Sequence, residues 1–81
     1  SLAEFRIPEG FIGKSLRDLD LRKQYHINIV SVRRADMDVD DVGNPLRQEK
    51  ILTPRPDDIL QVNDILIILG DEADIEKMKE M

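Results

Sequence analysis

The sequence predicts a small single domain of the α+β class, close to α/β in character, with about four strands and two helical segments. Short runs of alternating or continuous aliphatic residues, typical of strands, recur along the chain. Two segments with capping residues and helical spacing lie after the first strand and at the C-terminal end. At 81 residues the chain has room for one domain only.

A half-buried strand is predicted at residues 3–7, because apolar side chains alternate there with charged ones before a proline. The first helical segment begins after Ser15, which forms a capping box with Asp18, and its leucines face the core. Their spacing loses helical register before a second turn of helix at residues 22–25. We therefore expect a break within this segment.

Two central strands are predicted to be buried on both faces. Residues 27–32 place aliphatic side chains on both sides of the strand, and residues 65–69 are all aliphatic. Residues 50–53 are predicted to form a short edge strand, because two prolines follow it and lack backbone donors. A final helix capped by Asp71 closes the domain, with Ile75 and Met78 toward the core.

The segment at residues 34–49 shows no strand pattern, and we predict an acidic excursion between the second and third strands. Its aspartates alternate before a glycine, as in a calcium loop. The register fails, because an EF-hand counted from Asp36 needs Gly and Glu where the chain has Asp41 and Arg47. We therefore predict a solvated, partly mobile loop and no metal site.

The composition excludes several classes of function. With 17 acidic and 12 basic residues the formal charge is −5, which opposes binding to nucleic acid. With no cysteine, one histidine and no recognisable catalytic arrangement, the sequence predicts no catalytic residues and no enzyme. The longest apolar run is far shorter than the ~20 residues of a membrane helix, so no direct membrane insertion is expected. The absence of cysteine fits a cytoplasmic location.

The chain begins almost at once with a strand-like pattern and lacks an initiator Met, so we expect residues 1–81 to be a domain excised from a longer protein. A domain this small buries only about 60% of the surface of its unfolded chain. A second copy is a natural source of further burial. A symmetric homodimer is therefore predicted.

Several motifs follow one another in a characteristic order. They are a Gly-Lys-Ser-Leu turn, a Leu-Asp-Leu-Arg step, a tyrosine, an Asn-Ile-Val strand, a proline and an Asp-Ile-Leu strand ending in Gly, at residues 13–16, 19–22, 25, 28–30, 54 and 64–70. This order resembles the TrkA-C family, also called RCK-C, the C-terminal regulatory lobe of Trk- and Ktr-type potassium transport regulators. The Gly-x-Gly-x-x-Gly of a Rossmann nucleotide site is absent.

The resemblance implies a regulatory ligand-binding and dimerisation module of a potassium or other cation transport or channel system. Its partners would be the rest of the parent chain and a membrane cation transporter or channel. Some Ktr-type members bind cyclic di-AMP at an interface of two lobes. By the same resemblance, the ligand-binding residues here are Leu16, Arg22, Asn28 and Ile29, and no other cofactor is implied.

Structural interpretations remain open for these residues. Arg22 is spaced to pair with Asp18 on the helix surface, and Asn28 would satisfy a buried amide through a backbone contact within the monomer. The alternative function is a pure dimerisation domain without a small-molecule ligand. A ligand-induced rise in melting temperature separates the two functions.

Overall fold

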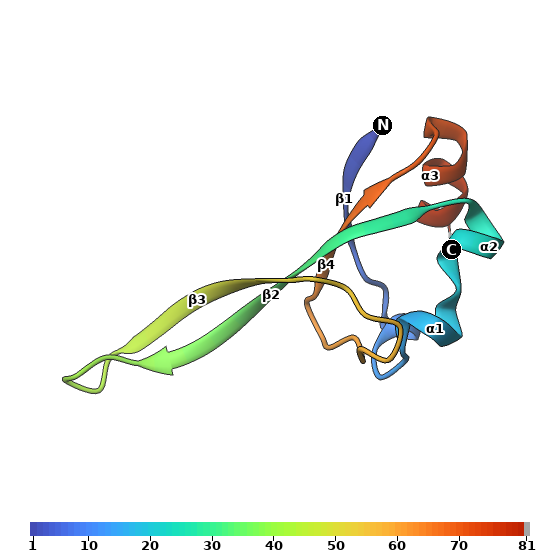
Figure 1. Cartoon of the computed structure of the whole chain (residues 1–81). Helices are drawn as coiled ribbons and strands as arrows, with labels where there is room; N and C mark the ends of the chain where they lie inside the picture. The colour runs from blue at the N-terminus through green and yellow to red at the C-terminus, as the bar shows by residue number, and fades with distance from the viewer. Residues whose placement is uncertain (81) are drawn as a thin grey trace.

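The computed structural model describes residues 1–80, the side chain of Met37 excepted, and forms a four-stranded antiparallel sheet with helices packed on one face (Figure 1). In chain order the elements are β1 (Leu2–Arg6), a short 3-10 turn η1 (Glu9–Phe11), α1 (Leu16–Leu19), α2 (Leu21–Tyr25), β2 (Asn28–Val39), β3 (Pro45–Leu52), β4 (Ile65–Leu69) and α3 (Glu72–Lys79). The strand order in the sheet is β1-β4-β2-β3. The predicted α+β class, with about four strands, is confirmed.

The first helical segment is broken in two, as its leucine spacing predicted. The Ser15 hydroxyl accepts a hydrogen bond from the Asp18 N–H at 3.1 Å, which caps α1. Asp20 lies in the left-handed region, with φ 45° and ψ 50°, and there α1 ends. His26, with φ 57°, ends α2 in the same way and turns the chain into β2.

The core lies between the helices and one face of the sheet. Its buried side chains are Phe5, Ile7, Phe11, Leu16, Leu21, Ile27, Val32, Leu60, Leu66, Ile68, Ile75 and Met78. The predicted inner face of α3 is therefore correct. Asp71 is at the N-cap position of α3, but its side chain makes no capping hydrogen bond.

The prediction that residues 27–32 and 65–69 are buried on both faces is wrong for the single chain. In β4, Leu66 is fully buried, whereas Leu69 on the opposite face is 45% exposed. Val30 in β2 is 51% exposed. The reason is that the helices cover one face of the sheet only, which leaves aliphatic side chains uncovered on the other.

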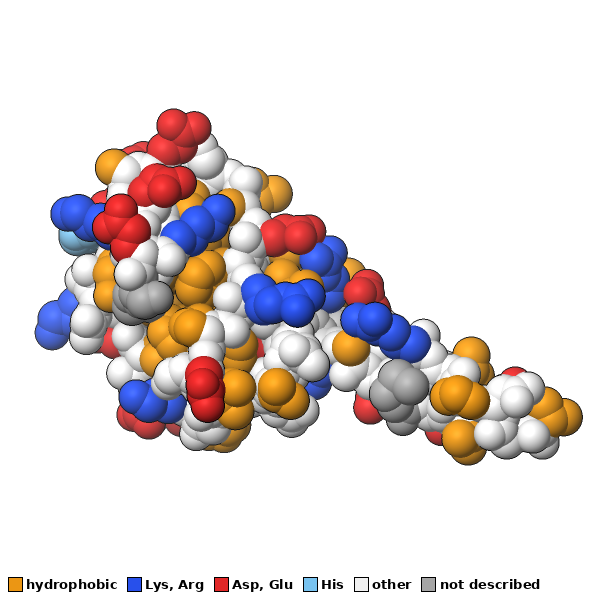
Figure 2. All heavy atoms as spheres, turned by 180° about the vertical axis from the view of Figure 1, so that it is seen from behind, with side chains coloured by type: hydrophobic (Ala, Val, Ile, Leu, Met, Phe, Trp, Pro, Cys, Tyr) orange, Lys and Arg blue, Asp and Glu red, His pale blue; other side chains and the backbone are white. Residues whose placement is uncertain are grey.

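The predicted acidic excursion at residues 34–49 is also wrong, because these residues continue β2 and begin β3. The two strands pair in unbroken register from Val32 opposite Leu52 to Val39 opposite Pro45. The predicted edge strand at residues 50–53 is thus only the end of a longer one. We call residues 36–49 the hairpin arm; it projects from the body and stretches the molecule to 48 Å by 23 Å by 21 Å (Figures 1 and 2).

Two aspartates hold the hairpin arm in shape. A carboxylate oxygen of Asp40 accepts the N–H groups of Val42 and Asn44 at 3.0 Å and 2.8 Å, which closes the turn. Across the strands, Asp36 pairs with Lys50 at 2.9 Å, and this hydrogen bond raises the pKa of Lys50. Two of the aspartates that suggested a calcium loop, Asp36 and Asp40, therefore stabilise a hairpin.

Among the described residues, no helix has the length and the apolar composition that a membrane span requires.

Candidate functional site

The site begins at an unpaired stretch of the β2 edge. Pairing between β2 and β3 stops at Val32, so Asn28 to Ser31 have β4 as their only strand partner among the described residues. A bulge between Ile29 and Ser31 interrupts that pairing as well. After Leu52 the chain leaves the sheet toward Pro54, and the space beside the start of β2 stays open.

A proline-bounded loop forms the opposite wall of this space. Its carbonyls accept two N–H groups at the start of α1, from Arg17 to Pro56 at 2.8 Å and from Leu16 to Asp58 at 3.1 Å. The first N–H groups of a helix have no partner within the helix, so these bonds satisfy them and fix the loop against α1. The wall is therefore anchored to the helix beside it.

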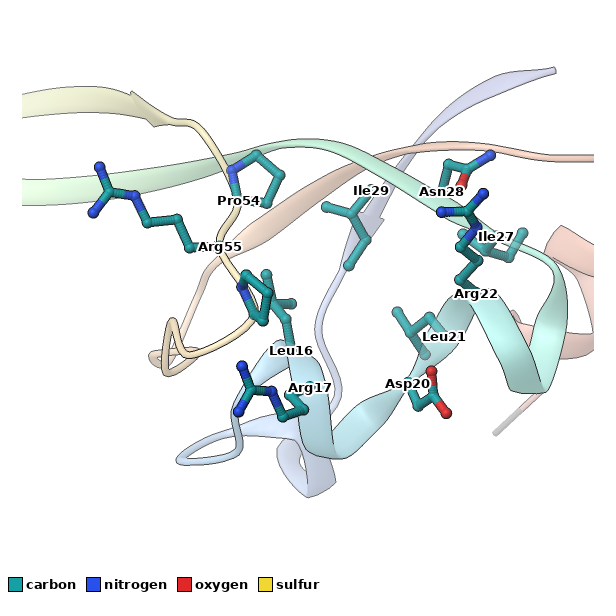
Figure 3. Close-up of a pocket in the computed structure, with 11 residues that line it drawn as sticks. Leu16, Arg17, Asp20, Leu21, Arg22, Ile27, Asn28, Ile29, Pro54 and Arg55 are labelled. Carbon is teal, nitrogen blue, oxygen red and sulfur yellow. The ribbon is translucent and has the colours of Figure 1, made fainter.

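A pocket of about 300 Å³ lies between this loop, the α1–α2 segment and the start of β2 (Figure 3). It is lined by Leu16, Arg17, Asp20, Leu21, Arg22, Ile27, Asn28, Ile29, Pro54, Arg55 and Pro56. All four residues predicted to bind a ligand thus meet in one pocket. Leu16 is buried and Ile29 half-buried, so they belong to an apolar floor that the core supports.

Arg22 and Asn28 are exposed at one end of the pocket, and Figure 3 shows their polar groups at that same end. Within residues 1–80, Arg22 makes no ion pair, so the predicted alternative pairing with Asp18 does not form. The expectation that Asn28 is buried was wrong, because the other face of the sheet is uncovered. Both polar groups are therefore available to a ligand.

The pocket is positively charged in a chain that is negative overall. Arg17, Arg22 and Arg55 line it, against the single carboxylate of Asp20. Arg17 also pairs with Asp57 at 3.3 Å, but both side chains are well exposed and such a pair is weak. Arg17 and Arg55 were missed from the sequence, and for Arg55 the reason is that only the folded loop brings it beside α1. A cationic rim over an apolar floor suits a ligand with both an anionic and an apolar part.

A second polar cluster is structural. Asp64 is fully buried and forms a two-point ion pair with Arg34, Nε to Oδ1 at 3.0 Å and Nη2 to Oδ2 at 2.9 Å. The hydrogen bonds that Arg34 donates to the Asp64 carboxylate raise the pKa of Arg34. Asp64 also accepts the Gln61 N–H at 2.8 Å, and Arg34 donates to the Ile59 carbonyl at 3.2 Å. The cluster ties the root of the hairpin arm to the turn before β4.

The described part of the chain holds no group of three or more His, Asp or Glu side chains placed to bind a metal ion.

Comparison with known proteins gives one consistent result. The family model described as the TrkA-C domain matches residues 2–81. The chain is 31% identical over 80 residues to the Ktr system potassium uptake protein C of Bacillus subtilis (strain 168), covering 99% of this chain and 31% of that protein. It is 28% identical over 76 residues to the K(+)/H(+) antiporter subunit KhtT of the same organism, covering 91% of this chain and 39% of that protein.

Among solved structures, the chain is similar to the RCK C domain of the potassium transport protein KtrA in complex with cyclic diadenosine monophosphate. The TM-score is 0.78 at 31% identity, over 99% of this chain and 80% of that one. The chain thus spans well under half of the length of the curated relatives it matches, and most of the solved domain.

Proposed function

The chain belongs to the TrkA-C domain family, and from this premise we propose that it is a regulatory module of a potassium transport or channel system that binds a small anionic ligand between two copies of itself. The observation that carries the proposal is the pocket beside β2. Four residues that the family motifs single out, from α1, α2 and the start of β2, line it together with two further arginines, of which Arg55 comes from a distant loop.

Cyclic di-AMP is the ligand we propose. The RCK C domain of KtrA, to which this chain is similar, was solved in complex with that nucleotide. In the pocket, the Arg22 guanidinium would donate charge-assisted hydrogen bonds to a phosphate, and the Asn28 amide would pair with an adenine edge. Leu16 and Ile29 supply the apolar surface on which a base rests. None of the aspartates of the hairpin arm lines the pocket, so their charge does not face the ligand.

Two features of the pocket support a homodimer. Its volume of about 300 Å³ lies at the bottom of the roughly 300–1,000 Å³ usual for ligand pockets, and it is open beside the unpaired edge of β2. A second copy related by a two-fold axis would double the lining residues and cover exposed Val30. Cyclic di-AMP is itself two-fold symmetric, so a two-fold site matches it.

The proposed partners are the rest of a longer parent chain and a membrane cation transporter or channel, with the module on the cytoplasmic side. The curated relatives are a potassium uptake protein and a subunit of a K(+)/H(+) antiporter. Both names concern potassium movement. We propose ligand-dependent control of such transport, without a catalytic step in this domain.

Thermal unfolding in the presence of cyclic di-AMP tests the proposal. A ligand that binds only the folded state at 100 times its Kd stabilises it by about 2.7 kcal/mol, which for a domain of this size raises the melting temperature by roughly 10 °C or more. Cyclic di-GMP, which has the same phosphates and other bases, is the matched control and should give a smaller rise. An unchanged melting temperature with cyclic di-AMP rejects this ligand and favours the pure dimerisation domain.

A further inference from the structure

The uncovered face of the sheet carries a second pocket, remote from the one beside β2. One level of the sheet runs from Arg6 in β1 through Ile65 in β4 to Arg33 in β2. Side chains alternate along a strand, so Arg6 and Arg33 point away from the core face that holds Phe5 and Val32. A pocket of about 270 Å³ lies here, at the root of the hairpin arm, and its polar lining is Arg6, Arg33, Arg47, Glu49 and Asn63.

The positive charges in this second pocket are only partly balanced. Arg33 donates to the carboxylate of Glu4 at 3.0 Å. Arg6 and Arg47 have no ion pair within the part of the chain that the structure describes. Three guanidinium groups therefore face one lining carboxylate, that of Glu49. Figure 2 shows Lys and Arg side chains gathered where the arm leaves the body.

A buried donor without a partner points to a missing acceptor. The Nε of Arg33 is buried, and no hydrogen-bond acceptor is found for it among the described residues. Buried donors in folded proteins are nearly always paired, so an orphaned one needs an explanation. An anion in the adjoining pocket would supply the acceptor once the partly exposed Arg33 side chain turns its Nε–H toward it, and would reduce the repulsion among the three guanidinium groups.

We propose that this second pocket binds a phosphate-type oxyanion. The guanidinium fork matches the oxygens of phosphate two at a time. Counting Glu4, which pairs with Arg33, three guanidinium groups stand against two carboxylates, and the excess positive charge favours a phosphate anion. The pocket is small and mostly polar, which suits a phosphate group better than a nucleotide base. Because Arg6 is in β1 and Arg47 is in the hairpin arm, a bound anion would also tie the arm to the body.

Side-chain NMR of the arginine Nε–H groups tests the proposal directly. Inorganic phosphate is titrated into the chain at neutral pH, with chloride adjusted to hold the ionic strength constant. The Arg33 Nε–H signal should shift and saturate. Arg6→Gln and Arg47→Gln should each weaken binding about tenfold, the effect of one charge-assisted hydrogen bond. The matched control is Lys50→Gln, which removes a positive charge from β3 at a position outside the pocket and should leave the affinity unchanged.

Backbone amide spectra of each variant confirm that the fold is intact. A non-saturating shift, a shift that chloride reproduces, or equal affinities for Arg6→Gln and Lys50→Gln would overturn the proposal. A parallel titration with glycerol phosphate separates the two sources of the anion. Tighter binding than inorganic phosphate assigns the site to a phosphate monoester, and weaker binding assigns it to the free anion.

Discussion

Arg22 is the residue on which ligand binding is expected to depend most. Its guanidinium lines the pocket, is exposed, and makes no ion pair among the described residues. Arg22→Ala should weaken the binding of cyclic di-AMP about ten- to a hundredfold, or ~1.5–3 kcal/mol, because one charge-assisted hydrogen bond to a phosphate is lost. Isothermal titration calorimetry measures the change.

The control for Arg22→Ala is the neighbouring Lys23→Ala. Lys23 is exposed, carries the same charge on the same helix, and does not line the pocket. Both variants should unfold at nearly the wild-type temperature. Equal affinity in the two variants would move the ligand away from Arg22.

The ion pair of Arg34 with Asp64 should matter for stability. Arg34→Met leaves the Asp64 carboxylate buried without its counter-ion, which costs about 3–5 kcal/mol and lowers the melting temperature by more than about 10 °C. Adding Asp64→Asn to this variant should recover part of the loss, because the buried charge is removed. Thermal unfolding followed by circular dichroism measures both variants.

Lys50→Met is the comparison for Arg34→Met, because Lys50 lies opposite Arg34 on β3 and its ion pair with Asp36 is exposed. Its melting temperature should stay close to that of the wild type. If Arg34→Met were as stable as Lys50→Met, the buried pair would not anchor the root of the hairpin arm.

For single residues, the sequence predicted some roles and missed others. Arg22 and Asn28 could be identified because they stand at fixed places in recognisable motifs. The Arg34–Asp64 pair could not be identified from the sequence, because the two residues are 30 positions apart and only the register of β2 with β4 brings them together. Burial of Asn28 was wrongly expected because aliphatic neighbours in a strand do not reveal whether a second layer covers the sheet.

Among the elements, the hairpin arm should be dispensable for folding of the body. Its side chains from residue 41 to residue 49 are all exposed. Its strands pair with each other, and the ion pair of Asp36 with Lys50 at its root is exposed. Replacing residues 36–48 by a two-residue Asn-Gly turn, which suits a hairpin of paired strands, should change the melting temperature by only a few degrees. Unfolding of the shortened chain at room temperature would show that the arm supports the core.

The elements with one buried face were predictable and the arm was not. β1 shows an apolar period of two, and the α1–α2 segment shows a cap and a break, because burial on one side imposes a pattern on the sequence. In the hairpin arm both faces meet solvent, so no such alternation is imposed on its strands. The extent of β2 and β3 follows from their pairing with each other, which no local pattern reveals.

For the whole molecule, charge and assembly are linked. The chain carries a net charge of −5, yet arginines concentrate in the pocket beside β2 and in the pocket on the uncovered sheet face. The net negative charge weakens nonspecific binding to polyanions, whereas the positive charge within each pocket still attracts a small anion. The uncovered aliphatic side chains and the unpaired β2 edge indicate where a second copy would fit.

The stoichiometry of cyclic di-AMP binding tests the central claim most directly. Isothermal titration calorimetry of the wild-type chain, with sedimentation at the same concentration to establish its mass, should give one ligand per two chains in a dimer. A two-fold site shared between copies can give no other ratio when saturated. One ligand per chain, or no heat of binding at high micromolar nucleotide, would contradict the account.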